Sequence, residues 1–591
     1  MLDGYTQAHR LIRLNTTLGP LALIPESFEG RQTMSKGFSF KVAAFSETLH
    51  TLAPKDLVGT AATIGLVQTD DSIRYLNGFI HDFEALGSGR GGQLTNYKLT
   101  IVSWLEMYLT KRTDCRIFQN KKVDDVIRDI FKLYGGDANF KISLKSPHPS
   151  RRYWVQYNET DFDFFKRICR LEGLAYYFNH SDGAHQLHIV DSSELLANLS
   201  PKKVKLQSHT AGHDHFTKWQ SSGHFATGTY EQRAYNYMSP SSAVKVNTKA
   251  KTEVASTPRV MEMESYKYGD THHGHSDGAE HVNARANQAV ERTKVATGSG
   301  DCRHLELGKH FEVELATGNL GLGGNFVDKG KTYTLTEVRI SANDTAGSFH
   351  CSVEAIPQGE LVYPKAVTPT INGLQTAVVT GPAGEEIYTD ELGRIKVQFH
   401  WDRLGGKDEN TTCWLRVMQS FAGPSFGAHF TPRIGQEVVV AFENGSPDRP
   451  FVIGGLYHPE NPPPYAGHQG TRAGIRTRST KGGSTANCNE LYFEDKKGKE
   501  EVYFQAEKDH NTVIKNDETR DVGNNQTITI GVDKSENVGN NEQHIVGKNL
   551  LIKAGTKIRL EVGGSVIEMT GGKIKVSSGH VDIDGGKIDL N

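Results

Sequence analysis

Apolar and polar positions alternate in short runs over the first 110 residues. FSFKVAAF, ATIGLV and YKLTIVSWL are examples, and clusters of Gly, Pro and Asp separate the runs. A period of two is typical of antiparallel strands with one buried face, so we predict a β-barrel or sandwich from about residue 5 to residue 110. A second set of strands is predicted from Leu305 to Ile356.

The period lengthens to that of a helix at three places. The first predicted helix follows Asn120, an available N-cap, and its apolar face has the i, i+3, i+4, i+7 spacing. That face consists of Val123, Val126, Ile127 and Ile130. The second helix follows Thr160, which with Asp163 resembles a capping box, and it ends at Gly173. The third, over about 281–296, is mostly polar.

A new strand-rich unit begins at Gln375, after the breaker-rich sequence VYPKAVTPTING. In RIKVQFHW one face is apolar and the other is polar. The apolar face consists of Ile395, Val397, Phe399 and Trp401. With CWLRVMQ, QEVVVAF and SPDRPFVIGGLY, about five short strands fall within about 85 residues, which fits a small closed barrel of the oligonucleotide/oligosaccharide-binding (OB) type. The proline run at 461–464 predicts a stiff exit.

From Val522 onward a glycine recurs at every eighth residue. The repeat glycines are Gly523, Gly531, Gly539, Gly547, Gly555, Gly563, Gly571 and Gly579. Apolar residues alternate after several of them, as with Leu550 and Ile552, which predicts one short strand per octad. The glycine, helped by Asn in GNN, is expected to form a corner with positive φ or close backbone approach.

One octad is too short for a chain to close a β-helix by itself. A parallel β-helix needs roughly two or three faces per turn to enclose a core, whereas eight residues supply one strand and one corner. Three intertwined chains would supply three faces and form a triangular prism without lateral sheet edges. We therefore predict a homotrimer. A calcium-binding roll is the alternative, but GGxGxD nonapeptides are absent, and Asp582 and Asp584 occur once rather than in every turn.

Composition narrows the possible classes. A length of 591 residues predicts about four domains. Lys and Arg number 67 against 69 Asp and Glu, so a net charge of -2 gives no support for a nucleic-acid or anionic-lipid partner. The amino terminus lacks the pattern of a signal peptide, and no run of about 18 apolar residues occurs. We expect synthesis in the cytoplasm and export, if any, by another route.

The six cysteines are scattered without CxxC spacing, which argues against zinc modules and a disulfide scaffold. They are Cys115, Cys169, Cys302, Cys351, Cys413 and Cys488. We expect reduced thiols that are mostly buried.

Several segments resemble the VgrG family, the trimeric spikes of type VI secretion systems, which are similar in plan to the hub and spike of contractile phage tails. TDCRIFQNKKVDDVIRDIF and QYNETDFDFFKRICRLEGLAYYF resemble the family's hub domain. YTDELGRIKVQFHWDR, CWLRVMQSFAG and PRIGQEVVVAFENGSPDRPFVIGGLYHPENPPPY resemble its small-barrel signature. The resemblance extends over nearly the whole chain.

This resemblance implies a spike that sits on the inner tube of a contractile device, punctures target envelopes and delivers effectors. It also implies assembly in the cytoplasm and export without a signal peptide into the medium or a target cell. Because the chain ends about a dozen residues after Gly579, we expect no further catalytic domain.

The predicted architecture is mainly β, with four parts. We expect a hub of two β-barrels with a few helices at 1–372, an OB-type small barrel at 373–465, a linker and start of the shaft at 466–513, and a shaft at 514–591. The shaft is the octad-repeat trimeric β-prism.

The richest polar cluster is GDTHHGHSDGAEH, whose residue types could bind a metal. Its members are His272, His273, His275, Asp277 and His281. The spacing matches no established zinc motif, so we interpret the cluster as a solvated loop. The same interpretation holds for His213 and His215 in GHDHF.

Two common enzyme signatures are missing from the sequence: it has no HExxH and no GxxxxGK[ST]. We interpret the pairs Asp124–Asp125 and Glu385–Glu386 as capping or solvation rather than as glycosidase carboxylates. Phe399 and Trp401 are interpreted as barrel core or trimer contact rather than as a platform for bases. We predict a non-enzymatic protein without a cofactor.

Three alternatives remain open. In the first, the chain is a spike that is itself an effector enzyme, with cell-wall or protease activity in the first 370 residues. In the second, it is the tail spike of a related phage-derived device. A trimeric β-helical adhesin is the third, but an export signal or membrane anchor is expected for that class.

The carboxyl-terminal sequence SGHVDIDGGKIDLN predicts a tip at which apolar residues of three copies converge. They are Val581, Ile583, Ile588 and Leu590. Such an end exposes strand edges that another chain can extend. His580 stands alone, without the repeated HxH that holds an iron in some phage spikes. We therefore expect a separate cap of the PAAR-repeat type, which the family resemblance implies.

Overall fold

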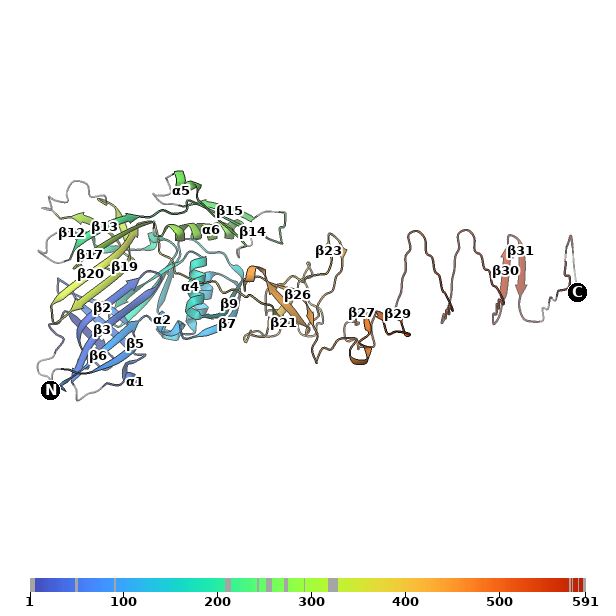
Figure 1. The fold of residues 1–591 in the computed structure, drawn as a ribbon, viewed down its shortest axis with the longest axis horizontal. Helices are drawn as coiled ribbons and strands as arrows, with labels where there is room; N and C mark the ends of the chain where they lie inside the picture. Colours follow the sequence, from blue (N-terminus) through green and yellow to red (C-terminus); the bar gives the residue numbers. More distant parts are fainter. Residues whose placement is uncertain are drawn as a thin grey trace. The chain divides into compact units, whose positions relative to one another are not determined.

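The computed structural model describes residues 6–47, 52–89, 92–207, 214–241, 244–250, 258–269, 275–291, 293–316, 328–572, 576, 578–582 and 584–587. Contacts divide the chain into two compact units, Met1–Lys508 and Asp509–Asn591 (Figure 1). None of the described helices is long and apolar enough to cross a membrane.

A twelve-stranded sheet forms most of the hub (Figure 1). In spatial order its strands are β1 (Ile12–Thr16), β4 (Ala61–Val67), β5 (Ile73–Gly89), β6 (Leu94–Val102), β3 (Gly37–Glu47), β2 (Ile24–Thr33), β19 (Thr332–Asn343), β18 (His310–Leu315), β12 (Asn198–Leu206), β13 (His215–Gly223), β17 (Lys294–Gly300) and β20 (Ser348–Pro357). Because β20 also pairs with β19, the last six strands close into a barrel. Backbone pairing thus closes one of the two barrels predicted for the hub, and the first six strands continue from β2 to β1.

Short elements cover this sheet and connect its halves. They are α1 (Pro54–Leu57), α2 (Trp104–Leu109), α3 (Val123–Lys132), α4 (Asp161–Leu171), the pair β7 (Thr113–Lys121) and β9 (Arg151–Thr160), and a small sheet of β8 (Phe140–Ser143), β10 (Ala175–Ser181) and β11 (Ala184–Val190). Trp104, Phe131 and Phe165 belong to the same buried apolar cluster as the barrel interiors. Most of the hub's buried apolar residues therefore belong to one core.

Helix α4 confirms the second helix prediction at both ends. The Thr160 hydroxyl accepts a hydrogen bond from the backbone N–H of Asp163 at 3.0 Å. Gly173, just past the helix, has φ of 68°, in the left-handed region that a helix stop favours.

Two other local predictions for the hub need correction at the ends of the elements. Helix α3 forms, but its N-cap is Lys122, because Asn120 still belongs to strand β7, where its φ is 54°, a conformation that Asn tolerates better than most residues. In YKLTIVSWL the strand ends at Val102, and Ser103 caps α2 by accepting the N–H of Glu106 at 3.2 Å.

The third predicted helix, the mostly polar one, begins at His275 rather than at about 281. Helix α6 (His275–Val290) packs Val282, Ala286 and Val290 against a sheet of β14 (Thr229–Ala234), β15 (Val244–Lys249) and β16 (Glu264–Tyr268), beside α5 (Pro258–Glu262). Its first turn has no large apolar residue to mark it, which explains the difference.

The small barrel contains β21 (Gln375–Thr380), β22 (Lys396–Phe399), β25 (Glu437–Phe442) and β26 (Pro450–Leu456), in the order β22-β21-β25-β26. A short hairpin of β23 (Ala422–Gly423) and β24 (Phe426–Gly427) lies between β22 and β25 in the sequence. The predicted strand in CWLRVMQ is reduced to bridges at Leu415 and Val417. Phe399 is buried and stacks on Trp401 with ring centroids 4.9 Å apart, as expected for barrel core.

A three-stranded sheet follows the proline run. Its strands are β27 (Arg472–Arg476), β28 (Glu490–Glu494) and β29 (Glu501–Gln505), with β28 in the centre. We call it the collar sheet.

The second unit is built from extended segments. The backbone bends at each repeat glycine except Gly563, where a Gly-Gly turn joins β30 (Ile558–Val562) to β31 (Ser565–Met569). Gly563, with φ of 56°, is the one repeat glycine at positive φ. The other seven bend without positive φ, where the sequence suggested either positive φ or a close approach of the backbone. That each repeat glycine forms a corner of a trimeric prism stays a prediction.

Candidate functional site

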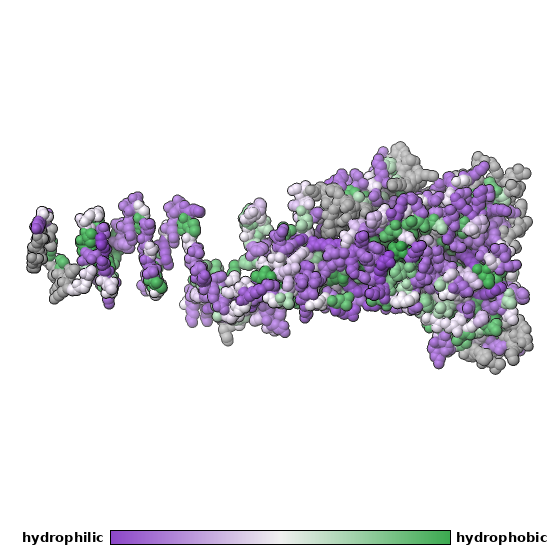
Figure 2. All heavy atoms as spheres, turned by 180° about the vertical axis from the view of Figure 1, so that it is seen from behind, coloured by the Kyte–Doolittle hydropathy of each residue, from purple (hydrophilic) through white to green (hydrophobic). Residues whose placement is uncertain are grey.

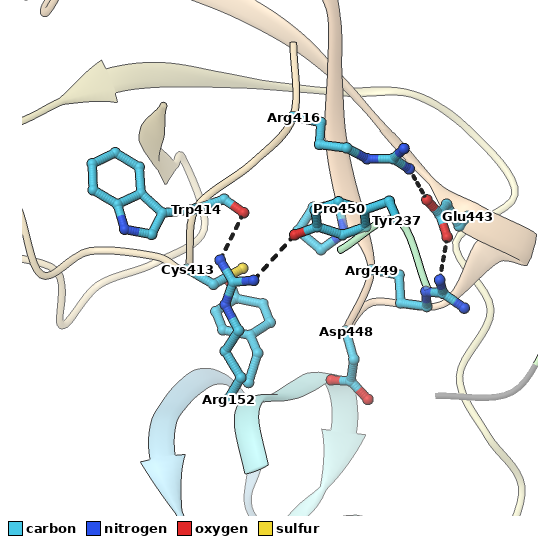
Figure 3. Close-up of a pocket in the computed structure, with 10 residues that line it drawn as sticks. Arg152, Tyr237, Cys413, Trp414, Arg416, Glu443, Asp448, Arg449 and Pro450 are labelled. Carbon is cyan, nitrogen blue, oxygen red and sulfur yellow. Dashed lines mark hydrogen bonds and ion pairs between the residues drawn. The ribbon is translucent and has the colours of Figure 1, made fainter. Parts of the chain in front are cut away.

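Two features of the described residues are candidates for function: the junction of hub and small barrel, and the apolar surface of the second unit. At the junction, Arg152 of β9 donates to the carbonyl of Trp414 and to the hydroxyl of Tyr237, both at 3.1 Å (Figure 3). The guanidinium of Arg416 lies over the Tyr237 ring, 4.4 Å from its centroid. One tyrosine therefore joins arginines from both parts of the chain.

Carboxylates complete this charged network. Glu443 forms ion pairs with Arg416 and, at 2.6 Å, with Arg449. A side-chain oxygen of Asp448 accepts the backbone N–H of Val155 at 2.7 Å. Burial raises the pKa of Asp448, and the positive charge of Arg167 opposes that rise. The carboxylate, in a loop of the barrel, thus gives a backbone N–H of a hub strand its hydrogen-bond acceptor.

Further polar contacts extend the junction. Asp114 pairs with Arg403 at 2.5 Å, and the Gln119 amide donates to the carbonyl of Asn410 at 2.6 Å. The Tyr157 and Trp401 rings meet edge to face at 5.8 Å. These contacts fix the barrel against the hub within one protomer.

The cavity enclosed by the junction residues is small. Its volume is about 40 Å³, space for roughly one or two water molecules and far less than a substrate pocket. The arrangement supports a rigid joint that carries load rather than a catalytic site.

The second unit exposes its apolar residues. No described residue from 509 to 587 is buried. The exposed large apolar residues are Val513, Ile514, Val522, Ile528, Ile530, Val532, Val538, Ile545, Val546, Leu550, Leu551, Ile552, Leu560, Val562, Val566, Ile567, Val576 and Val581. Figure 2 shows green, hydrophobic spheres among the purple ones along this unit. An apolar surface this extensive indicates burial against other chains.

The predicted histidine cluster is only partly described. His272, His273 and His213 lie outside the described residues, and His275 and Asp277 lie in the first turn of α6. His281, in α6, is buried with Nε2 3.9 Å from a Glu172 oxygen. His215, in β13, is buried with Nδ1 3.4 Å from an Asp301 oxygen. Among the described residues no three His, Cys, Asp or Glu side chains gather as metal ligands.

The carboxylate pairs have structural contacts. Asp125 accepts the backbone N–H of Lys122 at the start of α3, at 3.4 Å. Glu386 accepts the N–H of Gly482 at 2.8 Å, and Glu385 pairs with Lys481 at 2.7 Å. The first pair caps a helix, as the sequence indicated, whereas the second anchors a loop next to the collar sheet.

The tip is described at Val581, which is exposed, while Ile583, Ile588 and Leu590 lie outside the described residues. All six cysteines are free, four of them buried.

Sequence reasoning missed the junction. Its partners come from segments about 290 residues apart, as with Val155 and Asp448. No spacing rule connects such positions, although the sequence places Arg416 and Arg449 among barrel strands, where charged residues are uncommon.

Three family models match the chain in succession. Residues 31–346 match the phage tail baseplate hub (GPD), residues 376–457 match the type VI secretion system/phage-baseplate injector OB domain, and residues 473–583 match the bacteriophage T4 gp5 C-terminal trimerisation domain. The spike protein VgrG1a of Pseudomonas aeruginosa is 33% identical over 629 residues, covering 99% of this chain and 95% of that protein. This chain belongs to the VgrG family of type VI secretion spike proteins.

Two further comparisons agree with this assignment. The Vibrio cholerae protein named actin cross-linking toxin VgrG1 is 28% identical over 579 residues, which are 92% of this chain and 50% of that protein. The solved structure of the E. coli c3393 protein, described as a type VI secretion component similar to T4 tail proteins gp27 and gp5, has a TM-score of 0.54 at 19% identity and covers 75% of this chain and all of that one. The fold is thus that of the hub and spike of a phage tail.

Membership of this family confirms the role predicted from the sequence. This VgrG protein is a structural spike of a type VI secretion system that punctures target envelopes and delivers effectors. The resemblance read from the sequence and the mainly β fold class with an OB barrel and a trimerising terminus are confirmed as well.

Proposed function

We propose that three copies of this VgrG form one spike, in which the hub seats on the inner-tube protein and the shaft leads into the target. The main support is the exposure of the second unit. None of its described residues is buried, and 18 of its described large apolar residues are exposed. Burying each such side chain stabilises an assembly by roughly 1.5–3 kcal/mol, so three chains wound together gain the core that one lacks.

The junction fits this mechanical role. A push on the hub has to reach the shaft through the small barrel. The ion pairs Asp114–Arg403 and Arg449–Glu443, with the Asp448 contact to Val155, link the two in each protomer. The Arg449–Glu443 pair and the Asp448 contact to Val155 resist sliding, because Arg449 and the Val155 N–H are buried and would be left desolvated without their partners.

The tip is proposed to bind a separate PAAR-type cap. Val581 is exposed there, and the end of a β-prism offers unpaired backbone groups that another chain can continue. Effector proteins or their adaptors ride on the spike or its cap. The complex assembles in the cytoplasm and leaves without a signal peptide.

We further propose that this chain has no catalytic activity of its own. The cavity at the junction is too small for a substrate, and the two larger cavities in the described part of the hub, of about 430 and 630 Å³, lie open to solvent. A second candidate, a spike that is itself an effector enzyme, is favoured by one observation: a relative carries the name actin cross-linking toxin.

Co-purification tests the proposal. The tagged full-length chain is expected to retain both a tube protein and a PAAR-type cap. Deleting Gly586–Asn591 is expected to abolish retention of the cap while leaving the tube protein and the trimer mass unchanged. A shortened spike that keeps the cap at full strength would show that the cap docks elsewhere.

A further inference from the structure

Two tyrosine hydroxyls at the junction cavity have no acceptor for their protons. Tyr153 is 6% exposed, and its hydroxyl has no hydrogen-bond partner among the described residues. The Tyr237 hydroxyl accepts from Arg152 at 3.1 Å (Figure 3) and from Arg394 at 2.8 Å, which occupies both of its lone pairs. Both tyrosines line the cavity of about 40 Å³. Two O–H donors therefore meet one small space that offers them no acceptor.

Positive charge is in excess around the same cavity. The charged residues that line it are three arginines and two carboxylates: Arg152, Arg416, Arg449, Glu443 and Asp448. Glu443 pairs with both Arg416 and Arg449. Arg152 forms no ion pair within the described part of the chain, because its hydrogen bonds go to the hydroxyl of Tyr237 and to a backbone carbonyl. The lining thus carries one positive charge without a counterion.

A second unpaired cation lies near Arg152. The ammonium group of Lys396 is 5.2 Å from the centroid of the Trp414 ring, and Arg152 donates to the carbonyl of the same tryptophan. Lys396 donates to the carbonyl of Glu409 and has no ion pair with a described residue. Burial lowers the pKa of Lys396, and the positive charge of Arg152 lowers it further. Two like charges this close repel each other, and an anion beside them removes the repulsion.

The acceptors around the cavity already have donors. The carbonyl of Trp414 accepts from Arg152 at 3.1 Å. Asp448 accepts the N–H of Val155 at 2.7 Å, and the positive charges of Arg167 and Arg151 act on its carboxylate. The free capacity of the site is therefore that of donors and cations. Space for one or two water molecules also admits a monatomic anion, whereas phosphate, with five heavy atoms, needs more room.

We propose that the junction cavity binds one chloride ion, which accepts the protons of the Tyr153 and Tyr237 hydroxyls and neutralises the charge of Arg152. A halide brings no protons of its own, so it satisfies both hydroxyls without needing a further acceptor, as a water molecule would. Tyr153 belongs to β9 of the hub, and the opposite side of the cavity includes Arg449 and Pro450 of the barrel. The bound ion therefore holds barrel and hub together.

Hydrogen–deuterium exchange of the full-length protein tests this site. Potassium chloride replaces potassium gluconate at constant ionic strength, because the gluconate ion is too large for the cavity. The peptide that contains Tyr153 and Val155 is expected to exchange about tenfold more slowly when chloride is at ten times its Kd, since an ion that binds only the closed junction shifts the opening equilibrium by that factor. Broadening of the ³⁵Cl NMR line gives the Kd.

Tyr153→Phe removes the unpartnered hydroxyl and keeps the ring. This variant is expected to lose the chloride response, and in gluconate to exchange no faster than the unmodified protein, because the lost hydroxyl had no partner there. Tyr157→Phe is the matched control. It lies in the same strand, its hydroxyl accepts from Gln375 at 2.8 Å, and it does not line the cavity, so its chloride response is expected to stay.

Arg152→Gln removes the unpaired charge and supplies a second, independent variant. It is expected to weaken chloride binding at least about tenfold, since hydrogen bonds and charges at such a site each exceed that interval. Crystals soaked in bromide are expected to show an anomalous peak in the cavity. Equal exchange of the unmodified protein in chloride and in gluconate would overturn the inference, because water alone would then fill the cavity. A chloride response that persists in both Tyr153→Phe and Arg152→Gln would also overturn it, since the ion would act elsewhere.

Discussion

Replacing Asp448 with Ala is expected to loosen the hub–barrel junction at a defined atom. The substitution removes the acceptor of the Val155 N–H, which lies in a buried part of β9, 2.7 Å from the carboxylate. It also removes the charge that faces Arg167 and Arg151. The perturbation is therefore local, and it leaves the backbone of both partners in place.

The magnitude follows from the cost of an unsatisfied group. A buried N–H without an acceptor costs about 1–3 kcal/mol. Burial raises the pKa of Asp448, which means that the folded state holds this carboxylate at some cost, and its removal regains part of that. We expect a net loss of about 1–2 kcal/mol, which corresponds to roughly a 5–30-fold change in a local opening equilibrium.

Hydrogen–deuterium exchange on the full chain measures this directly. The peptide that contains Val155 is expected to exchange faster by that factor in Asp448→Ala, with shaft peptides unchanged. Asp448→Asn is the matched control, because its amide oxygen keeps an acceptor of similar geometry. Equal exchange in Asp448→Ala and the unmodified chain would refute the argument that this carboxylate joins barrel to hub.

Two further predictions concern the shaft and a half-buried histidine. Deleting the octad Val538–Ile545 is expected to preserve the trimer mass in light scattering. Deleting Val538–Asn540 is expected to lower trimer stability, because it breaks both the period of two and the period of eight. Equal loss of trimer stability in the two variants would show that the octad is not the structural unit. Burial lowers the pKa of His148, but hydrogen bonds with Asp191 and Glu172 outweigh it and raise the pKa from 6.5 to about 9. The stability that the charged His148 contributes is therefore present below pH 6.5 and lost as pH rises through 9. A urea midpoint that stays flat between pH 6 and 10 would contradict this.

Local signals were sufficient for some elements. Helix α4 could be predicted because Thr160, Asp163 and Gly173 act through neighbouring backbone groups. The N-cap of α3 was misplaced because Asn120 is equally suited to positive φ, the conformation that it has here within strand β7. Sequence alone does not decide between two uses of the same side chain.

The junction required three-dimensional knowledge. Arg152 and Trp414 are 262 positions apart, and their hydrogen bond exists only once the hub and barrel have folded and met. The apolar surface of the shaft could be predicted because its period is written in the chain itself. Interactions that repeat leave a pattern in sequence, whereas a single long-range contact leaves none.

The shared core of the shaft has a consequence for inheritance. Each layer takes one side chain from every copy, so a single faulty chain damages the whole spike. If half of the chains in a cell carry a disruptive shaft substitution and copies mix at random, about one spike in eight contains three sound chains. Such an allele acts as a dominant one, and an intact second gene copy gives little protection against it.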